Sequence, residues 1–486
     1  MNTNISILEP QQLWHYFYQL TQIPRPSKNE GEAVRFVVNE GKTLGLETIK
    51  DEIGNVIIRK PATPGMENVK GVVLQAHLDM VPQKNSDKQH DFTKDPIEAY
   101  EEEGWVKANG TTLGADNGIG VAAALAVLSS KNLKHGPVEA LFTIDEETGM
   151  TGANHLKPGI LKGDILINMD SEDEGELYVG CAGGTDANAV FTFMEEEFPN
   201  DFVGIKISLT GLKGGHSGMD INLGRGNANK LMFRLLKYLV ANEEVRLSSI
   251  EGGSLRNAIP REAFAIVGVP KEKLESVKQT VERFKDIFLN ELSSVEPHLQ
   301  LTIESIKEPS FLMDEMTQDD LINAIQACPN GVIRMSTDIH GLVETSLNLA
   351  IVQTVNKEVH VKALIRSSVD TAKEDVESTL ESIFLLAGAN VWFDGQYPGW
   401  KPNPDSEILK IMQSVYQNRW GKTPEIKAIH AGLECGILGS AYPNWDMISF
   451  GPTIKFPHSP DEKVNVESVK KFWEFLIATL ENIPSK

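Results

Sequence analysis

Helical and strand patterns alternate along the first part of the chain. Apolar residues recur every three or four positions at 29–45, and an alanine-rich stretch at 118–130 is also typical of a helix. Short apolar runs bounded by turn residues predict strands. These runs are 54–60, 71–81, 138–144 and 163–170. Alternating strands and helices predict an α/β domain with a largely parallel central sheet.

The pattern changes after about residue 186. Longer stretches of alternating polar and apolar residues predict strands in a sheet with one open face, separated by long amphipathic helices. The strands are expected at 203–212, 262–270, 301–308, 345–355 and 358–368, and the helices at 227–240, 274–292 and 375–388. The helix–strand order of the first part returns near a turn-rich segment at 398–406. We therefore expect an α/β catalytic domain from 1–186 and 396–486, interrupted by an α+β domain at 187–395.

Composition limits the classes of function. The 486 residues carry a formal net charge of −22, which argues against binding to nucleic acid or to an anionic membrane surface. No run approaches the roughly 18 apolar residues of a membrane span. The three cysteines are too few and too scattered for a disulfide framework. With no signal-like start, these features predict a cytoplasmic protein.

Histidines and carboxylates follow the predicted strands of the first domain. His77 and Asp79 lie two apart, as a metal ligand and its orienting acid would, although such a pair is also a common hydrogen-bonded pair. Asp116 lies between glycines before a helix, where it could cap the helix or bridge two ions.

Glu146 and Glu147 follow an apolar strand and, as neighbours at a strand end, are expected to point to opposite sides. One could bind a cation while the other acts as a general base. Asp170 ends another strand, and His458 lies between prolines in a loop. Each could also be an ordinary residue of a solvated turn.

Together these positions give two imidazoles and three carboxylates, a set that suits zinc, manganese or cobalt. Loops at the carboxyl ends of parallel strands are where such sheets form their sites. His216 lies in a glycine-rich turn of the inserted domain, where it could stabilise an oxyanion or be a simple turn residue.

The stretches HLDMV, GADNG, DEETG, NMDSE, GGHSG and FGPTIKFPHSPDE, in that order, resemble the di-metal peptidase family of aminoacylase and carboxypeptidase G. The segments LQAHLDMVPQK and HAGLECGIL are most similar to the dipeptidases of that family. The resemblance spans nearly the whole chain. It implies a metal-dependent hydrolase that cleaves Xaa-His and other dipeptides, including β-alanyl-histidine, through a water bridging two metal ions.

The resemblance also implies roles for individual residues. His77 and Asp170 would bind one ion, Glu147 and His458 the other, and Asp116 both. Glu146 would be the general base, Asp79 would orient His77, and His216 would bind the oxyanion. The inserted domain would be a lid, and a homodimer through it is plausible. The expected substrate contacts are Asn257, Arg366, His430, Gly432 and Glu434.

Other activities share this metal set. A tripeptidase, a carboxypeptidase or an N-acyl-amino-acid deacylase would use the same ligands. A non-catalytic metal-binding protein would be expected to lose Glu146 or a ligand, and a two-metal phosphoesterase would be expected to add basic residues near the motifs.

Overall fold

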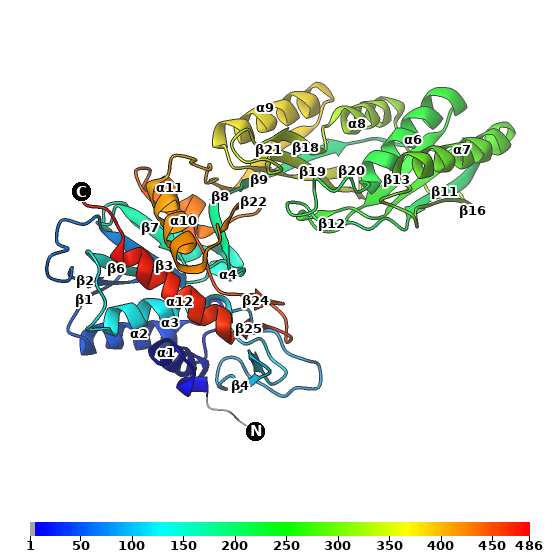
Figure 1. Ribbon diagram of the computed structural model, residues 1–486. Helices are drawn as coiled ribbons and strands as arrows, with labels where there is room; N and C mark the ends of the chain where they lie inside the picture. The colour runs from blue at the N-terminus through cyan, green and yellow to red at the C-terminus, as the bar shows by residue number, and fades with distance from the viewer. Residues whose placement is uncertain (1–4) are drawn as a thin grey trace. The chain divides into compact units, whose positions relative to one another are not determined.

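The chain divides into two units that are interleaved in sequence (Figure 1). A computed structural model describes residues 5–486. The first unit comprises the residues up to Gly180 together with Pro402–Ala428 and Leu433–Lys486, and the second comprises Cys181–Lys401 and Ile429–Gly432. The expected borders at 187 and 395 fall inside strands β9 (Gly183–Thr192) and β21 (Asn390–Tyr397). The units change outside these strands because both strands pair within the sheet of the second unit.

The first unit is built on an eight-stranded sheet. In spatial order its strands are β1 (Glu47–Lys50), β2 (Val56–Lys60), β6 (Val138–Thr143), β3 (Val72–His77), β7 (Ile165–Asn168), β23 (Asp446–Ser449), β8 (Glu176–Cys181) and β22 (Glu425–Ile429). The four central strands, β6, β3, β7 and β23, are parallel. Strands β1, β2 and β8 pair antiparallel. The predicted α/β fold is confirmed, with the parallel pairing confined to the centre of a mixed sheet.

The central strands are buried along their whole length, which explains their continuous apolar sequences. Every residue of β3, β6 and β7 is buried. Parallel sheets are covered on both faces, so their strands do not alternate between apolar and polar residues. The inner helix α3 (Ala115–Ser129) packs against β3 and β6, and its small side chains are almost all buried. An apolar surface all round the helix is what such a buried position requires.

The remaining elements of the first unit surround this core. Its other helices are η1 (Ile5–Ile7), α1 (Gln11–Thr21), α2 (Gly31–Thr43), α4 (Glu146–Gly149), α5 (Thr151–His155), α10 (Glu407–Trp420), α11 (Glu434–Ala441) and α12 (Val466–Glu481). A small sheet contains β24 (Ile454–Lys455), β25 (Lys463–Asn465), β5 (Trp105–Ala108) and β4 (Ala99–Glu102).

The second unit has an antiparallel sheet of nine strands. Eight follow the order β16 (Gln300–Ile306), β11 (Phe202–Thr210), β15 (Ala263–Pro270), β13 (Arg246–Gly252), β19 (Val343–Val355), β20 (Glu358–Ser367), β9 and β21, and β18 (Gly331–Met335) also pairs with β19. Two short pairs are β10 (Glu195–Glu196) with β17 (Leu312–Met313) and β12 (Gly215–His216) with β14 (Ala258–Ile259).

Helices cover one face of this sheet (Figure 1). They are α6 (Ala228–Glu243), α7 (Leu274–Leu292), α8 (Glu315–Ala327) and α9 (Asp370–Leu386), with a short η2 (Lys271–Lys273) before α7. One apolar core joins helices and strands, and Phe233 and Phe288 lie fully buried in it. The one-sided packing agrees with the alternating strand pattern, since only one face of each strand meets the helices.

Candidate metal centre and active site

Three predicted site residues lie at the carboxyl ends of neighbouring parallel strands in the first unit. His77 is the last residue of β3, and Asp170 follows the end of β7 by two residues. Glu147 follows the end of β6, the other neighbour of β3. Because these strands run parallel, their carboxyl ends meet at one edge of the sheet. Side chains far apart in sequence are therefore brought together.

Two further residues reach this edge from loops. Asp116 lies in the first turn of α3, but its backbone is extended (φ −79°, ψ 110°) and does not continue the helix. His458 lies in the loop after β24 with a left-handed backbone (φ 59°). Both departures from regular structure direct a side chain towards the strand ends.

The five residues form two groups that share Asp116. His77 Nε2 lies 3.1 Å from Asp116 Oδ1 and 3.3 Å from Asp170 Oδ1. His458 Nε2 lies 3.1 Å from Asp116 Oδ2 and 3.0 Å from Glu147 Oε2. In each group, one atom from every residue lies within 4.8 Å of the others, as ligands of a single ion would. The structure thus brings together all five residues expected to bind metal.

The donor atoms of this cluster fit cations. Glu147 Oε1 is buried and has no hydrogen-bond partner among the residues described, and Asp170 Oδ1, also buried, has only the His77 ring nearby. Buried carboxylate oxygens without partners are costly, and a divalent ion removes that cost. A mixture of imidazole nitrogen and carboxylate oxygen suits zinc, manganese or cobalt.

The protonation of the cluster reflects the same excess of negative charge. Hydrogen bonds to Asp116 and Glu147 raise the pKa of His458 to about 11. Burial opposes protonation of His77, but Asp170 and Asp116 beside it raise its pKa well above the usual value. In the protein alone, the carboxylates therefore favour protonated, positively charged His77 and His458.

Asp79 connects His77 to the acidic turn. Its Oδ1 lies 3.3 Å from His77 Nδ1, and its carboxylate accepts the backbone N–H groups of Glu146 (3.0 Å) and Glu147 (3.2 Å). Burial disfavours its ionisation, but the hydrogen bonds from His77 and these amides hold its pKa at about 2. Asp79 is thus an ionised carboxylate beside Nδ1 of His77.

Glu146 and Glu147 are not at a strand end, so the expected alternation of their side chains was wrong. They open the short helix α4, because Asp145 before them has a left-handed backbone (φ 50°) that turns the chain. The hydroxyls of Thr148 and Thr151 donate to the Asp145 carboxylate, and Glu30 accepts its backbone N–H at 3.1 Å. These contacts hold a turn that would otherwise be strained.

Glu146, the first residue of α4, is a carboxylate whose pKa is shifted by its surroundings. Burial raises its pKa well above the usual value, although His77 opposes this shift. A general base is most effective when its pKa lies near the working pH.

Glu434 is a second buried acid beside the cluster. Its Oε2 accepts hydrogen bonds from Gln75 Nε2 (2.6 Å) and Thr143 Oγ1 (2.8 Å), and its Oε1 has no partner among the described residues. Burial raises its pKa to about 7.

His216 and Arg366 are close neighbours within the second unit. His216 Nδ1 accepts the backbone N–H groups of Gly218 (3.1 Å) and Met219 (3.0 Å), so the neutral ring carries its proton on Nε2. Burial and the nearby Arg366 lower the pKa of His216, which keeps the ring neutral. Arg366 donates to Ser217 Oγ (3.3 Å) and to the hydroxyl of Tyr397 (3.0 Å).

The other expected substrate contacts also belong to the second unit. His430 is buried, and its Nε2 lies 2.7 Å from Ser346 Oγ. Asn257 is exposed, and its backbone carbonyl accepts the N–H of Ser217 at 2.8 Å. Gly432 is half-buried.

Comparison with known proteins identifies the family. Residues 73–482 match Peptidase family M20/M25/M40. The chain belongs to this family. The resemblance to di-metal peptidases that the sequence shows is thereby confirmed.

Members of the M20 family with high similarity match along the whole chain. The cytosol non-specific dipeptidase of Escherichia coli (strain K12) is 49% identical over 484 residues, which cover 100% of both chains. The crystal structure of aminoacylhistidine dipeptidase from Vibrio alginolyticus shares 51% identity and a TM-score of 0.97, covering 100% of this chain and 99% of that one. Aminopeptidase PepT from Bacillus cereus shares 17% identity at a TM-score of 0.58, with 98% and 99% covered, and shows the fold alone.

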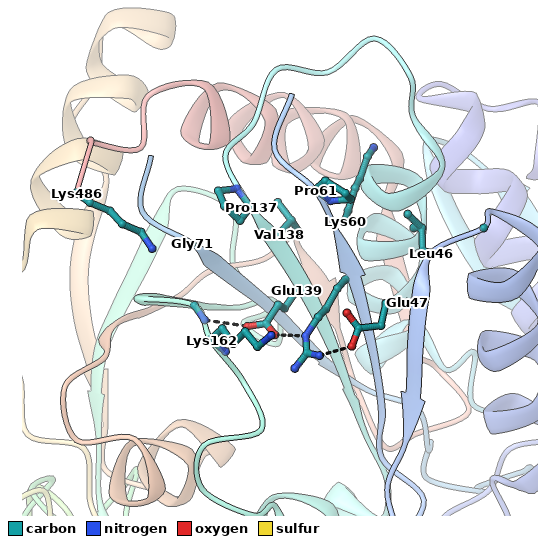
Figure 2. Close-up of a pocket in the computed structure, with 13 residues that line it drawn as sticks. Leu46, Glu47, Lys60, Pro61, Gly71, Pro137, Val138, Glu139, Lys162 and Lys486 are labelled. Carbon is teal, nitrogen blue, oxygen red and sulfur yellow. Dashed lines mark hydrogen bonds and ion pairs between the residues drawn. The ribbon is translucent and has the colours of Figure 1, made fainter. Parts of the chain in front are cut away.

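A cavity at the opposite end of the M20 sheet lacks the features of a catalytic site. Its volume is about 440 Å³, and it lies where β3 and β6 begin, among Arg59, Glu139 and Lys162 (Figure 2). Arg59 Nε donates to Glu139 at 2.8 Å, and Glu139 also accepts the backbone N–H of Lys162 at 2.6 Å. Glu139 is thus satisfied by Arg59 and by the backbone, and the candidate metal ligands lie at the other end of the sheet.

Proposed function

We propose that this M20-family protein is a dipeptidase that uses two divalent metal ions. The observation that carries the proposal is the pair of histidine–carboxylate groups sharing Asp116, beside the buried carboxylate of Glu146. The relatives at 49% and 51% identity are named as dipeptidases, which supports a dipeptide as substrate.

The five clustered residues would hold the ions. His77 and Asp170 would bind one, His458 and Glu147 the other, and Asp116 both, and we propose zinc, with manganese and cobalt as alternatives. When bound, two such ions polarise a carbonyl and lower the pKa of water. Asp79 would keep His77 in the tautomer and orientation that a ligand needs.

Glu146 would act as the general base and then the general acid. It would take a proton from the attacking water and pass it to the amine released from the peptide bond. A positioned group of this kind contributes about 10²–10⁴-fold to a rate. The raised pKa of Glu146 supports both transfers, because the carboxylate holds the proton between them.

His216 would stabilise the negative charge that develops on the carbonyl oxygen. Its proton lies on Nε2, because Nδ1 accepts two backbone N–H groups. A donor fixed in this way needs no reorientation during the reaction. We propose that the second unit acts as a lid that carries this group.

The two ends of a dipeptide would be recognised by opposite charges. Arg366, oriented by Tyr397, suits the α-carboxylate because a guanidinium can donate two parallel hydrogen bonds to it. The unpartnered Oε1 of Glu434 suits the free α-amino group. Asn257, His430 and Gly432 would line the rest of the substrate site.

A substrate panel tests the proposal. Metal-stripped protein would receive zinc, manganese or cobalt and be assayed on β-alanyl-histidine, several α-dipeptides, one tripeptide and one N-acetyl amino acid. We expect metal-dependent cleavage confined to dipeptides. Cleavage of only the tripeptide or the acetylated compound would show that the substrate is not a dipeptide. Inactivity on every compound with metal bound would overturn the enzymatic function.

Substitution of Glu146 tests the mechanism. Glu146→Gln should lower kcat by at least about 10²-fold, because the amide cannot accept the proton. Metal content measured by mass spectrometry should stay at the wild-type value, since Glu146 lies outside the two groups that share Asp116. Retained turnover would contradict its role as the base.

The cellular setting belongs to the proposal as well. The relative in Escherichia coli is named a cytosol dipeptidase, and no helix within residues 5–486 is both long and apolar enough to cross a membrane. We propose a cytoplasmic enzyme.

We also propose a homodimer through the second unit, where Leu386 is 89% exposed and Met194 70%. Sedimentation of the purified protein tests the dimer.

A further inference from the structure

Two buried charged side chains hold the turn that carries Asp116. Arg25 and Glu462 are each 2% exposed, and neither belongs to the groups that would bind metal. Buried charges are costly unless other groups satisfy them. The partners of these two side chains therefore indicate what they do.

Glu462 binds the turn from one side. Its Oε2 accepts the backbone N–H groups of Leu113 (2.7 Å) and Gly114 (3.0 Å). Its Oε1 accepts those of Ala115 (2.8 Å) and Asp116 (3.2 Å). Two of these N–H groups belong to the residues just before α3 and two to its first two residues, so one carboxylate satisfies four consecutive backbone donors. Glu462 belongs to the loop that carries His458, so it joins that loop to the turn.

Arg25 binds the turn from the other side. Its Nη2 donates to the carbonyl oxygen of Gly114 at 2.5 Å. Its Nη1 donates to the carbonyl oxygens of Leu78 (2.9 Å) and Asp79 (3.0 Å), which directly follow His77. Arg25 therefore joins the turn to the end of β3.

The glycines around Asp116 make room for this guanidinium. A Cβ atom at Gly114 would lie 2.6 Å from Arg25 Nη2, and one at Gly118 would lie 2.7 Å from it. Both distances are too short for non-bonded atoms. The GADNG stretch thus admits Arg25 as well as presenting Asp116.

The geometry points to Arg25 and Glu462 as positioning residues of the metal centre. Together they fix the turn of Asp116 against the end of β3 that carries His77 and the loop that carries His458. They thereby set the distances from Asp116 to both histidines. The inference rests on the proposed function, because it assigns the two residues a role in metal binding. Since Asp116 is shared, loosening its turn weakens binding at both metal positions.

Cobalt titration of metal-free protein tests the inference. Glu462→Gln keeps the size of the side chain but turns an amide NH₂ towards backbone N–H donors. Arg25→Lys keeps the charge, but a single ammonium cannot replace the two guanidinium nitrogens that donate to the carbonyls of Leu78, Asp79 and Gly114. Loss of a group that orients a ligand costs about 10–100-fold in metal affinity. Both variants should raise the cobalt dissociation constants by that factor, while KM for a dipeptide at saturating cobalt changes little.

Glu139→Gln is the matched control. Glu139 is also a buried carboxylate that accepts two backbone N–H groups, those of Lys162 (2.6 Å) and Gly163 (2.8 Å), but it lies at the other end of the sheet. This variant should lose stability and keep wild-type cobalt affinity. If Glu462→Gln does not fold, Arg25→Lys decides the question.

The outcomes separate the two proposals. Wild-type affinity in the variants, or an equal loss in Glu139→Gln, would overturn the positioning role alone. A wild-type protein that binds no ion would overturn the proposed function and the positioning role with it.

Discussion

Asp116 is the residue that the two candidate metal groups share. One carboxylate oxygen faces His77 and the other faces His458, at 3.1 Å each. No other residue of the five belongs to both of the groups that contain Asp116. A change at this position therefore has a different consequence from a change at any single outer ligand.

Replacing Asp116 should remove both ions. In Asp116→Ala each group loses one oxygen, and the two histidines lose the acceptor between them. We expect metal content, measured by mass spectrometry after dialysis, to fall from two ions per chain to below one. Glu146→Gln serves as the control that keeps two. An Asp116→Ala protein with both ions still bound would contradict the bridging role.

His430 should make stability depend on pH. Burial, with Arg366 and His216 nearby, lowers its pKa to about 3, whereas the unfolded chain has a value near 6.5. Between these values the unfolded state binds one more proton, so the free energy of unfolding falls as the pH falls, by up to about 1.36 kcal/mol per unit.

The His430→Gln variant tests this dependence. Urea unfolding of metal-free protein at pH 7, 5.5 and 4.5 should give a shallower loss of stability in the variant than in the wild type. The difference between the two proteins isolates His430 from the other titrating groups. Equal slopes would show that His430 takes up a proton equally in the folded state.

The sequence pointed to the five candidate metal ligands, which the structure brings together, but not to the residues that support them. Each of the five follows an apolar strand or a glycine turn, and the family resemblance relates them. Glu462 lies in a charged loop, and the partners of its carboxylate are more than 340 residues away. Arg25 and Glu30 likewise act through contacts that depend on the fold. A buried charge gives no local signal when its partners are backbone groups distant in sequence.

At the scale of elements, prediction succeeded where one environment covers a whole strand or helix. Strands β3, β6 and β7 are buried throughout and read as continuous apolar runs. Strand β13 was not predicted, because its sequence RLSSIEG mixes buried and exposed positions around a bulge. The parallel order could not be extended to the sheet edge, since β2 has an apolar sequence like the central strands but pairs antiparallel with β6 and β1.

Helix α6 begins at the N-cap residue Asn227, whose side chain also bonds to strand β19. The Asn227 side chain accepts the N–H of Lys230 at 3.1 Å, and its Nδ2 donates to the carbonyl of Leu349 at 3.0 Å. Asn227→Ala should cost about 1 kcal/mol for the cap, and more because the Leu349 carbonyl and Asn330 Oδ1 both lose a donor. Asn465→Ala, which removes the cap of α12 at Ser468 N, provides the matched control. Chemical unfolding measures both, and an equal loss would contradict the added role of Asn227.

At the scale of the whole molecule, the candidate metal ligands and a large apolar core belong to different units. All five candidate metal ligands belong to the first unit, whereas the apolar core around Phe233 lies within the second. Stability of the second unit and metal binding by the first should therefore respond to different substitutions.

Phe233→Ala tests this separation. Truncation of a fully buried phenylalanine costs about 3–5 kcal/mol, so calorimetry should show a lower unfolding temperature for the second unit. Metal content at 25 °C should remain two ions per chain. Loss of metal in this variant would show that the first unit depends on the folding of the second.

Cys181–Lys401, the main segment of the second unit, begins and ends at one point. Cys181 and Trp400 exchange two backbone hydrogen bonds, of 3.0 and 2.9 Å, and the Cα atoms of such a pair lie about 5.5 Å apart. If the segment between Cys181 and Trp400 were replaced, a linker of only a few residues would reconnect the chain. Recombination at this juncture could therefore replace the inserted segment in evolution, or in a designed chimera, while the sheet that carries the metal ligands keeps its own sequence. One hydrolytic centre could in this way acquire new substrate sizes by acquiring a new insert.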